Sequence, residues 1–218
     1  MIPVRDTSVS RGFAPATALF ILINFGVFIE EIRIGEQIFQ LFGISPFDIY
    51  RYLTKGQGTF LDLHLSILAA GFMHGGYIHL FGNMIFLSVF GPAVEKRIGI
   101  IRYVVFYLSA IFVSFYAHTF FYPTSPVPVV GASGAIAAVM GAYLVFNPKA
   151  KILTIIPLLF FIEVIEIPSI VFMLVWFSLQ GANGYLSIHS QTTIAWFSHI
   201  GGFLMGVAVG IHLRWFRQ

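Results

Sequence analysis

Long apolar stretches, separated by short polar segments, constrain this chain more than any other feature of its sequence. Runs such as "ALFILINFGVFI" (18–29) and "SIVFMLVWFSL" (169–179) contain no charged residue. Lipid cannot hydrogen-bond to peptide groups, so a chain that crosses it must form helices or a closed barrel. A barrel needs strands of alternating polarity, and the sequence lacks that alternation. Only 10% of the 218 residues are charged, against roughly 25% in soluble domains. We therefore expect an all-α, multi-pass integral membrane protein.

Six transmembrane helices are expected, within a single domain that covers residues 1–218. Their ranges are 13–29, 77–94, 100–122, 133–146, 168–179 and 192–213. No small-residue cleavage site follows the first span, which is therefore interpreted as a retained anchor. Lys and Arg are concentrated in the segments on one side, which predicts that both termini are cytoplasmic. That side holds Arg5, Arg11, Lys96, Arg97, Arg102, Lys149, Lys151, Arg214 and Arg217, and the other holds Arg33, Arg51 and Lys55.

Two connections between the spans are unusual. Residues 30–76 form a long first outer loop that is too apolar for a free linker, so we expect it to lie in the membrane interface. Residues 149–167, "KAKILTIIPLLFFIEVIEI", contain an apolar run that is too short to cross a bilayer. We expect a cytoplasmic hairpin or an interfacial segment there.

Four polar side chains on three spans are predicted to reach similar depths. The proline-rich stretch "YPTSPVPVVGA" (122–132) cannot be helical, so Ser133 begins a short helix about 10 Å below the outer boundary. Irregular backbone at that depth must line a wet cavity or be buried in protein. His199 in the last span, and Asn83 with His79 in the second, lie about as deep. The predicted cavity opens to the outer side.

Small residues at intervals of four predict how the fourth and sixth spans meet. Such stripes let helix backbones approach closely in membranes. One stripe consists of Gly134, Ala138 and Ala142, and the other of Ser198, Gly202, Gly206 and Gly210. Facing stripes would bring Ser133 and His199 within hydrogen-bonding reach.

This constellation has the elements of nucleophilic catalysis. A serine attacks a carbonyl only when a base removes its proton, and histidine is suited to that role. The resulting oxyanion needs hydrogen-bond donors, which Asn83, His79 and the backbone N–H groups of Gly131 and Ser133 could supply. No Asp or Glu lies within the second, fourth or sixth predicted span, so the site is interpreted as a Ser–His dyad. The structural alternative is that Ser133 only caps a helix and that His79 and Asn83 only bridge helices.

Three ordered motifs resemble the rhomboid family of intramembrane serine proteases. They are "HGGYIHLFGNMIFLSVFGPAVEKRIG" (74–99), "GASGAIAAVMGAYL" (131–144) and "SHIGGFLMG" (198–206). The resemblance implies that Ser133 is the nucleophile, His199 the base, and His79 and Asn83 part of the oxyanion hole. It also implies cleavage of membrane-protein substrates in or beside their transmembrane segments, without metal or cofactor.

Two positions depart from the pattern of some bacterial members. Ala137 replaces a tyrosine that packs on the histidine, and Tyr50-Arg51 is the nearest approximation to a Trp-Arg pair in the first outer loop. These departures leave the support of the histidine and the anchoring of the loop open. The role of His74 is also open, since it could shape the site or only cap the loop.

The sequence also bears on other functions and on the membrane in which the protein lies. A catalytically inert rhomboid-like protein that binds membrane clients is the main alternative, and intact Ser133 and His199 argue against it. A solute transporter would need paired charges or inverted repeats, which are absent. The net charge of +3 and the lack of a basic run predict no nucleic-acid partner, and the absence of cysteine excludes disulfides. Besides the lipid bilayer, the expected partners are transmembrane substrates. A bacterial plasma membrane suits a chain this short.

Overall fold

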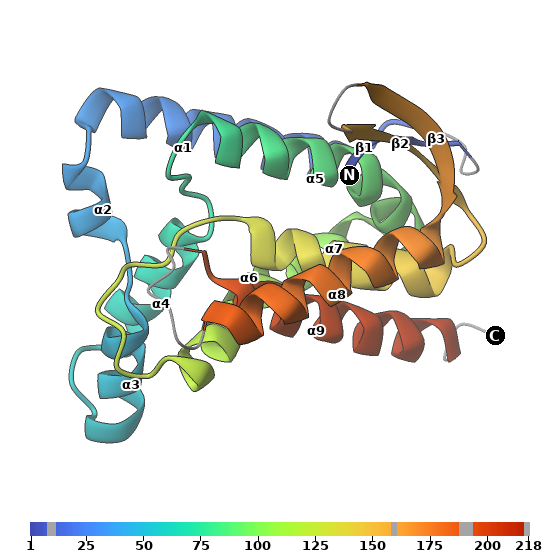
Figure 1. Ribbon diagram of the computed structural model, residues 1–218. Coiled ribbons are helices and arrows are strands. Elements are labelled where there is room, and N and C mark those ends of the chain that lie inside the picture. The colour runs from blue at the N-terminus through green and yellow to red at the C-terminus, as the bar shows by residue number, and fades with distance from the viewer. Residues whose placement is uncertain (8–11, 158–160, 188–193, 216–218) are drawn as a thin grey trace.

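A computed structural model describes residues 1–7, 12–157, 161–187 and 194–215 (Figure 1). Its helices are α1 (Pro15–Ile34), α2 (Gln37–Phe42), α3 (Pro46–Lys55), α4 (Phe60–Ala70), α5 (Tyr77–Ile98), α6 (Ile100–Phe121), α7 (Ser133–Phe146), α8 (Ser169–Ser187) and α9 (Trp196–Trp215). Its strands are β1 (Ile2–Asp6), β2 (Lys151–Pro157) and β3 (Ile162–Pro168).

The predicted helical membrane bundle is confirmed. Five described helices, α1, α5, α6, α8 and α9, are long and apolar enough to cross a membrane, and α7 is a shorter apolar helix of 14 residues. Helices α1 and α8 run to Ile34 and Ser187, five and eight residues beyond their predicted ends at 29 and 179. The predicted start of the last span, at residue 192, lies outside the described residues.

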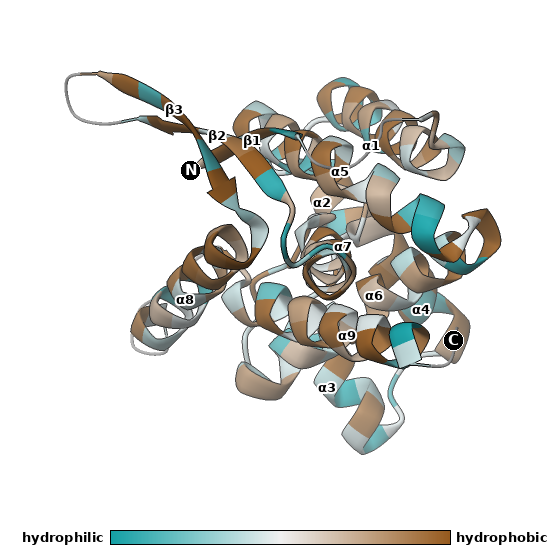
Figure 2. Cartoon of the chain, turned by 90° about the vertical axis from the view of Figure 1, so that its right-hand side faces the viewer, coloured by the Kyte–Doolittle hydropathy of each residue, from teal (hydrophilic) through white to brown (hydrophobic). Residues whose placement is uncertain are grey.

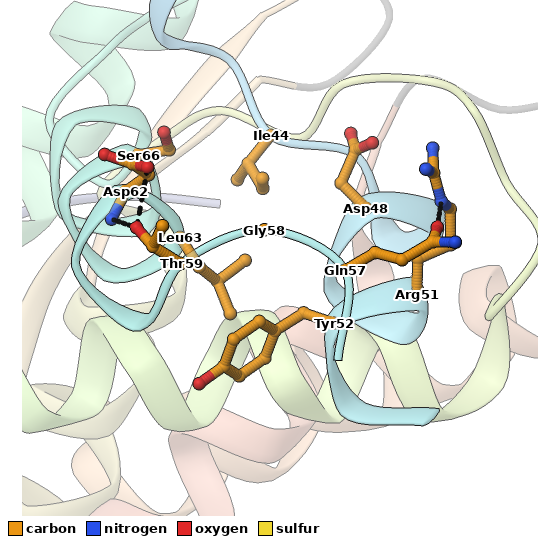
Figure 3. A pocket seen from close by; sticks show the side chains of 10 residues that line it. All are labelled: Ile44, Asp48, Arg51, Tyr52, Gln57, Gly58, Thr59, Asp62, Leu63 and Ser66. Carbon is orange, nitrogen blue, oxygen red and sulfur yellow. Dashed lines mark hydrogen bonds between the residues drawn. The ribbon is translucent and has the colours of Figure 1, made fainter. Parts of the chain in front are cut away.

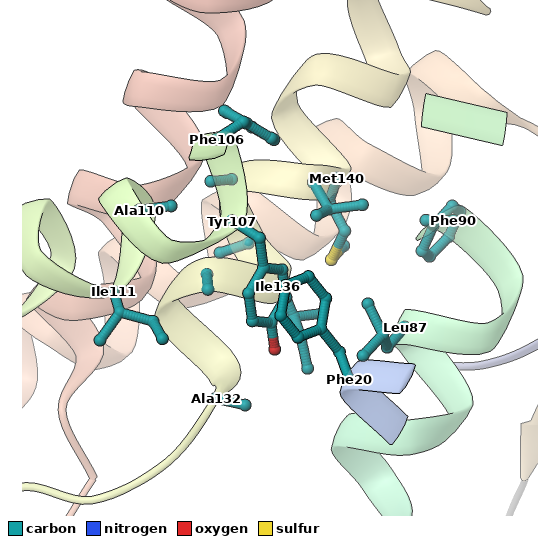
Figure 4. Close-up of a cluster of buried hydrophobic side chains, with 14 of the residues drawn as sticks. Phe20, Leu87, Phe90, Phe106, Tyr107, Ala110, Ile111, Ala132, Ile136 and Met140 are labelled. Atoms are coloured by element: carbon teal, nitrogen blue, oxygen red, sulfur yellow. The ribbon is translucent and has the colours of Figure 1, made fainter. Parts of the chain in front are cut away.

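Helix α7 lies at the centre of the bundle, as the view along its axis in Figure 2 shows. Its sequence is apolar on every face, which is typical of a helix surrounded by protein. Every residue from Gly134 to Tyr143 is buried. Side chains from four helices form the core here, among them Ile136 from α7, Leu87 from α5, Tyr107 from α6 and Phe20 from α1 (Figure 4). This packing fixes the start of α7 relative to its neighbours.

A small antiparallel sheet lies at one end of the bundle. Strands β2 and β3 form a hairpin, one of the two forms expected for residues 149–167, with Ile152 opposite Ile167. The N-terminal strand β1 pairs with the other edge of β2, giving the order β1-β2-β3. The prediction of an all-α chain therefore missed the three strands, and the pairing of β1 joins segments about 150 residues apart. Since β1 and the α7–α8 connection share one sheet, they lie on the same side of the bundle.

The first outer loop folds into three short helices at the opposite end of the bundle (Figure 1). Ser45 and Asp48 form a capping box at the start of α3, and Thr59 accepts a hydrogen bond from the N–H of Asp62 at the start of α4. Both pairs satisfy backbone donors that a helix start leaves unpaired. The apolar loop that the sequence places in the membrane interface is thus a structured element and not a free linker.

A buried carboxylate joins α5 to the start of α1. Glu95 is 2% exposed, and its two oxygens accept hydrogen bonds from the N–H groups of Ala16 and Thr17 and from the Thr17 hydroxyl, at 2.7–2.9 Å. Helix α1 has no side-chain cap of its own, so Glu95 supplies the missing acceptors. Because α5 extends to Ile98, Glu95 lies within the second span, contrary to the predicted boundary. It is 12 residues from Asn83, or about 18 Å along the helix, so it is remote from the candidate site.

Candidate active site

Ser133 is the first residue of α7, and the loop before it is held in place by backbone hydrogen bonds. The N–H of Val129 donates to the Ile44 carbonyl and that of Gly131 to the Ala70 carbonyl, both at 2.9 Å. Gly131 has a φ of +130°, a conformation that favours glycine. The cap position of α7 is occupied by Ala132, which makes no side-chain cap bond. The hydroxyl of Ser133 does not cap α7 and instead bonds to a side chain on a different helix.

That partner is His199, in the first turn of α9. The Oγ of Ser133 and the Nε2 of His199 are 2.7 Å apart, a normal hydrogen-bond distance. The two residues are 66 positions apart in the sequence, so their contact depends entirely on how α7 and α9 pack.

The two small-residue stripes face each other in the structure. A Cβ built on Gly202 would lie 2.9 Å from the carbonyl carbon of Gly134 and closer still to its oxygen. A Cβ on Gly206 would lie 2.7 Å from the carbonyl carbon of Ala138. Gly141, which the predicted stripe did not include, approaches the backbone of α9 in the same way. Absent side chains therefore let the two backbones touch beside Ser133 and His199.

The other nitrogen of His199 contacts a residue that the sequence analysis did not identify. Its Nδ1 lies 2.8 Å from the Oε1 of Gln180, a buried side chain on α8. The predicted fifth span ended at residue 179, which left Gln180 in a loop. A polar residue inside a membrane helix would have been the signal, since such residues are expensive and often functional.

Two tryptophan rings flank the imidazole of His199. The ring centroid of Trp176 lies 6.2 Å from that of His199, and Trp196 meets it edge to face at 5.9 Å. The ring of His199 is therefore contacted from α8 and from its own helix, and the question that Ala137 left open concerned support from α7.

Asn83 and His74 form a second polar pair. The Nε2 of His74 lies 2.9 Å from the Asn83 amide nitrogen, and its Nδ1 lies 3.2 Å from the Phe72 carbonyl. A carbonyl only accepts, so Nδ1 carries the proton and Nε2 accepts from Asn83. An amide nitrogen has two hydrogens, so this bond leaves one for an acceptor in the site. His74 thus orients Asn83 rather than only capping the loop.

The neutral state of His74 follows from its surroundings in the turn between α4 and α5. Burial, with a smaller contribution from the ring of His79, lowers the pKa of His74 from 6.5 to about 3. Its backbone N–H donates to the buried carboxylate of Glu31 at 2.9 Å, which ties this turn to the end of α1. His74 can therefore remain an acceptor for Asn83 across the physiological pH range.

His79 lies against the loop that leads into α7. A Cβ added at Gly131 would lie 2.8 Å from the Nε2 of His79 and 3.6 Å from the Oγ of Ser133, so the three residues are neighbours. The expectation that Gly131 supplies an oxyanion donor needs correction, because its N–H already donates to the Ala70 carbonyl. Its role in this geometry is to admit the His79 ring beside Ser133.

A polar pocket of about 260 Å³ lies in the first outer loop, apart from the Ser133–His199 pair (Figure 3). Arg51 donates from Nε to the Gln57 side chain at 2.6 Å, and its guanidinium lies 5.4 Å from the ring centre of Phe47. Arg51 thus joins α3 to the segment that follows it within the same loop. Among the described residues, no cluster of three or more His, Cys, Asp or Glu side chains could hold a metal ion.

Comparison of the sequence with known proteins gives matches to one family. A family model described as the Rhomboid domain matches residues 64–216. The chain is 30% identical over 155 residues to RHOMBOID-like protein 6, mitochondrial, of Arabidopsis thaliana, a match that covers 67% of this chain and 43% of that protein. It is 27% identical over 164 residues to RHOMBOID-like protein 4 of the same plant, which covers 70% of this chain and 36% of that protein. The chain thus spans less than half the length of these curated relatives. Because the family model matches most of its length, the chain belongs to the rhomboid family.

Proposed function

We propose that this membrane protein is an intramembrane serine protease whose catalytic dyad is Ser133 and His199. The observation that carries the proposal is the 2.7 Å contact between the Ser133 hydroxyl and His199 Nε2. A hydroxyl in this geometry can pass its proton to the imidazole as its oxygen attacks a carbonyl.

The reaction follows from that proton transfer. His199 Nε2 takes the Ser133 proton while Oγ bonds to the scissile carbonyl carbon, giving a tetrahedral oxyanion. The C–N bond then breaks, and the proton passes from Nε2 to the departing amine. Water attacks the acyl-enzyme, giving one proton to His199 and its oxygen to the carbonyl carbon. Collapse of this second intermediate returns the proton to Ser133 and releases the carboxylic acid.

We propose that three hydrogen-bond donors stabilise the oxyanion. The candidates are the second amide hydrogen of Asn83, the ring of His79 and the backbone N–H of Ser133 at the positive end of α7. The bond from Asn83 to His74 holds the amide in one orientation before substrate arrives. Such preorganised donors commonly contribute about 3–4 kcal/mol each.

The substrates are transmembrane segments of other proteins, since the dyad lies in a bundle of membrane-spanning helices. We further propose that both termini are cytoplasmic, that the active site opens to the outer side, and that the membrane is a bacterial plasma membrane. The shared sheet of β1 and the α7–α8 connection supports placing these two segments on one side.

The test uses purified protein in liposomes with a membrane-anchored reporter. Ser133→Ala and His199→Ala should each abolish cleavage, and the double variant should be no worse, because catalytic partners are strongly non-additive. Ser88→Ala is a matched control, because this exposed hydroxyl on α5 bonds only to the carbonyl one turn earlier among the described contacts. A fluorophosphonate probe should label the wild type and not Ser133→Ala. Cleavage by Ser133→Ala above about 10% of wild type would contradict the proposal, and an unlabelled, inactive wild type would favour a client-binding protein instead.

A further inference from the structure

Gln180 is a polar side chain buried inside an apolar helix, and crossing a membrane does not require a polar residue there. It lies on α8, a helix that exposes much of its apolar surface, and is itself only 7% exposed. Burying an amide in an apolar setting is costly unless both its donor and its acceptor are satisfied. Both are satisfied here, and one partner is His199.

The two hydrogen bonds of Gln180 define which end of the amide faces the imidazole. Its Nε2 donates to the Trp176 carbonyl, one helical turn earlier, at 3.3 Å. Its Oε1 therefore faces His199 Nδ1, at 2.8 Å. The reversed amide would place an N–H toward Nδ1 and an oxygen against the Trp176 carbonyl, two acceptors facing each other. The backbone of α8 thus selects the orientation.

This orientation has a chemical consequence for His199. An amide oxygen only accepts, so Nδ1 must carry the proton of the neutral ring. The lone pair then lies on Nε2, directed at the hydroxyl of Ser133. The other tautomer would present an N–H to Ser133 and could not remove its proton. Fixing the tautomer of a catalytic histidine is the task that an aspartate performs in a Ser–His–Asp triad.

We propose that Gln180 is a positioning residue that holds His199 in the tautomer and ring orientation required to activate Ser133. The inference rests on the proposed function. The site would then consist of Ser133 on α7, His199 on α9 and Gln180 on α8. The third residue is neutral and orients the histidine. A carboxylate in the same place would be an uncompensated charge inside the membrane, which is expensive. The amide supplies the acceptor without that charge.

A purely structural role for Gln180 makes different predictions from a positioning role. If Gln180 only fastens α8 to α9, its loss should lower stability, and activity should fall in proportion to the unfolded fraction. If it positions His199, turnover should fall in folded enzyme while substrate binding is unchanged. The pH dependence should also respond to the charge of the residue at this position.

The experiment compares Gln180→Leu and Gln180→Glu with wild type in liposomes, at several pH values. Gln180→Leu keeps much of the side-chain volume and removes the acceptor, so kcat should fall about tenfold or more with KM within about twofold. Gln180→Glu restores an acceptor in the same place, so it should recover much of the rate at high pH. Its carboxylate also stabilises the protonated imidazole, so the acidic limb of its pH–rate profile should move to higher pH. Ser178→Ala is the control on α8, an exposed polar residue two positions away.

The outcomes separate this inference from the proposed function. A cleaving wild type, an inactive Ser133→Ala and an unchanged kcat in Gln180→Leu would overturn the positioning role and leave the dyad intact. The same holds if Gln180→Glu shows the pH profile of wild type. If Gln180→Leu fails to fold, Gln180→Glu alone decides, because its shifted acidic limb requires contact with the catalytic base. Should wild type not cleave at all, the proposed function fails first.

Discussion

Replacing Gly202 by alanine adds one methyl group where the backbones of α7 and α9 are in close contact. That methyl carbon would lie 2.9 Å from the carbonyl carbon of Gly134 and closer to its oxygen. Carbon atoms pack at about 3.5–4.0 Å, so the helices must separate on the order of 1 Å. Gly134 is the neighbour of Ser133, and Gly202 is three residues from His199. The displacement therefore falls directly on the catalytic pair.

The expected effect on rate exceeds the effect on stability. Overpacking costs about 1–3 kcal/mol, and alanine in a helix recovers about 0.5–1 kcal/mol relative to glycine. The net loss of stability is therefore at most about 2.5 kcal/mol. A 1 Å misplacement of reacting groups costs about a hundredfold in rate, equivalent to about 2.7 kcal/mol of barrier. Gly202→Val should lower both the stability and the cleavage rate further than Gly202→Ala.

The assay pairs thermal unfolding in detergent with the cleavage rate in liposomes. Gly26→Ala, on α1, is the control, because a Cβ there would meet nothing within 4 Å. Gly206→Ala is the comparison variant, since it clashes similarly with Ala138 but lies seven residues from His199. It should lose comparable stability and much less activity. Wild-type activity in Gly202→Ala, or equal loss in Gly206→Ala, would refute the reasoning.

Three further predictions follow from single contacts. Asn83→Ala should lower kcat with little change in KM in steady-state cleavage assays, and a change confined to KM would rule out an oxyanion role. Glu95→Gln should destabilise the fold by about 1–3 kcal/mol in thermal unfolding, since one oxygen that accepts from α1 becomes a donor; an unchanged melting temperature would show that the cap is dispensable. The pKa of His74 is lower in the folded state than its ordinary 6.5, so its contribution to stability is full above pH 6.5 and is lost as pH falls toward 3. His74→Gln should flatten that dependence in unfolding measured between pH 3 and 7, and an unaltered profile would assign it to other groups.

The sequence by itself determined the membrane bundle, because apolar length and the need to satisfy backbone groups in lipid leave few alternatives. It also predicted the short helix that begins at Ser133, since three prolines and a glycine preclude a helix just before it. The spacing of small residues predicted that Gly134 and Gly202 meet, because a period of four puts them on one helix face. These are local rules, readable from neighbours along the chain.

Only the tertiary structure decided the groups that surround the dyad. Gln180 reaches His199 because α8 continues past its predicted end at residue 179 and packs beside α9. The pairing of β1 with β2 joins distant segments, as does the cap that Glu95 supplies to α1. The N–H of Gly131 is committed to the Ala70 carbonyl of another segment, which no local pattern could indicate. Contacts of this kind depend on which helices pack together, and apart from the small-residue stripes most helix faces carry apolar side chains that suit lipid and protein equally and do not specify a partner.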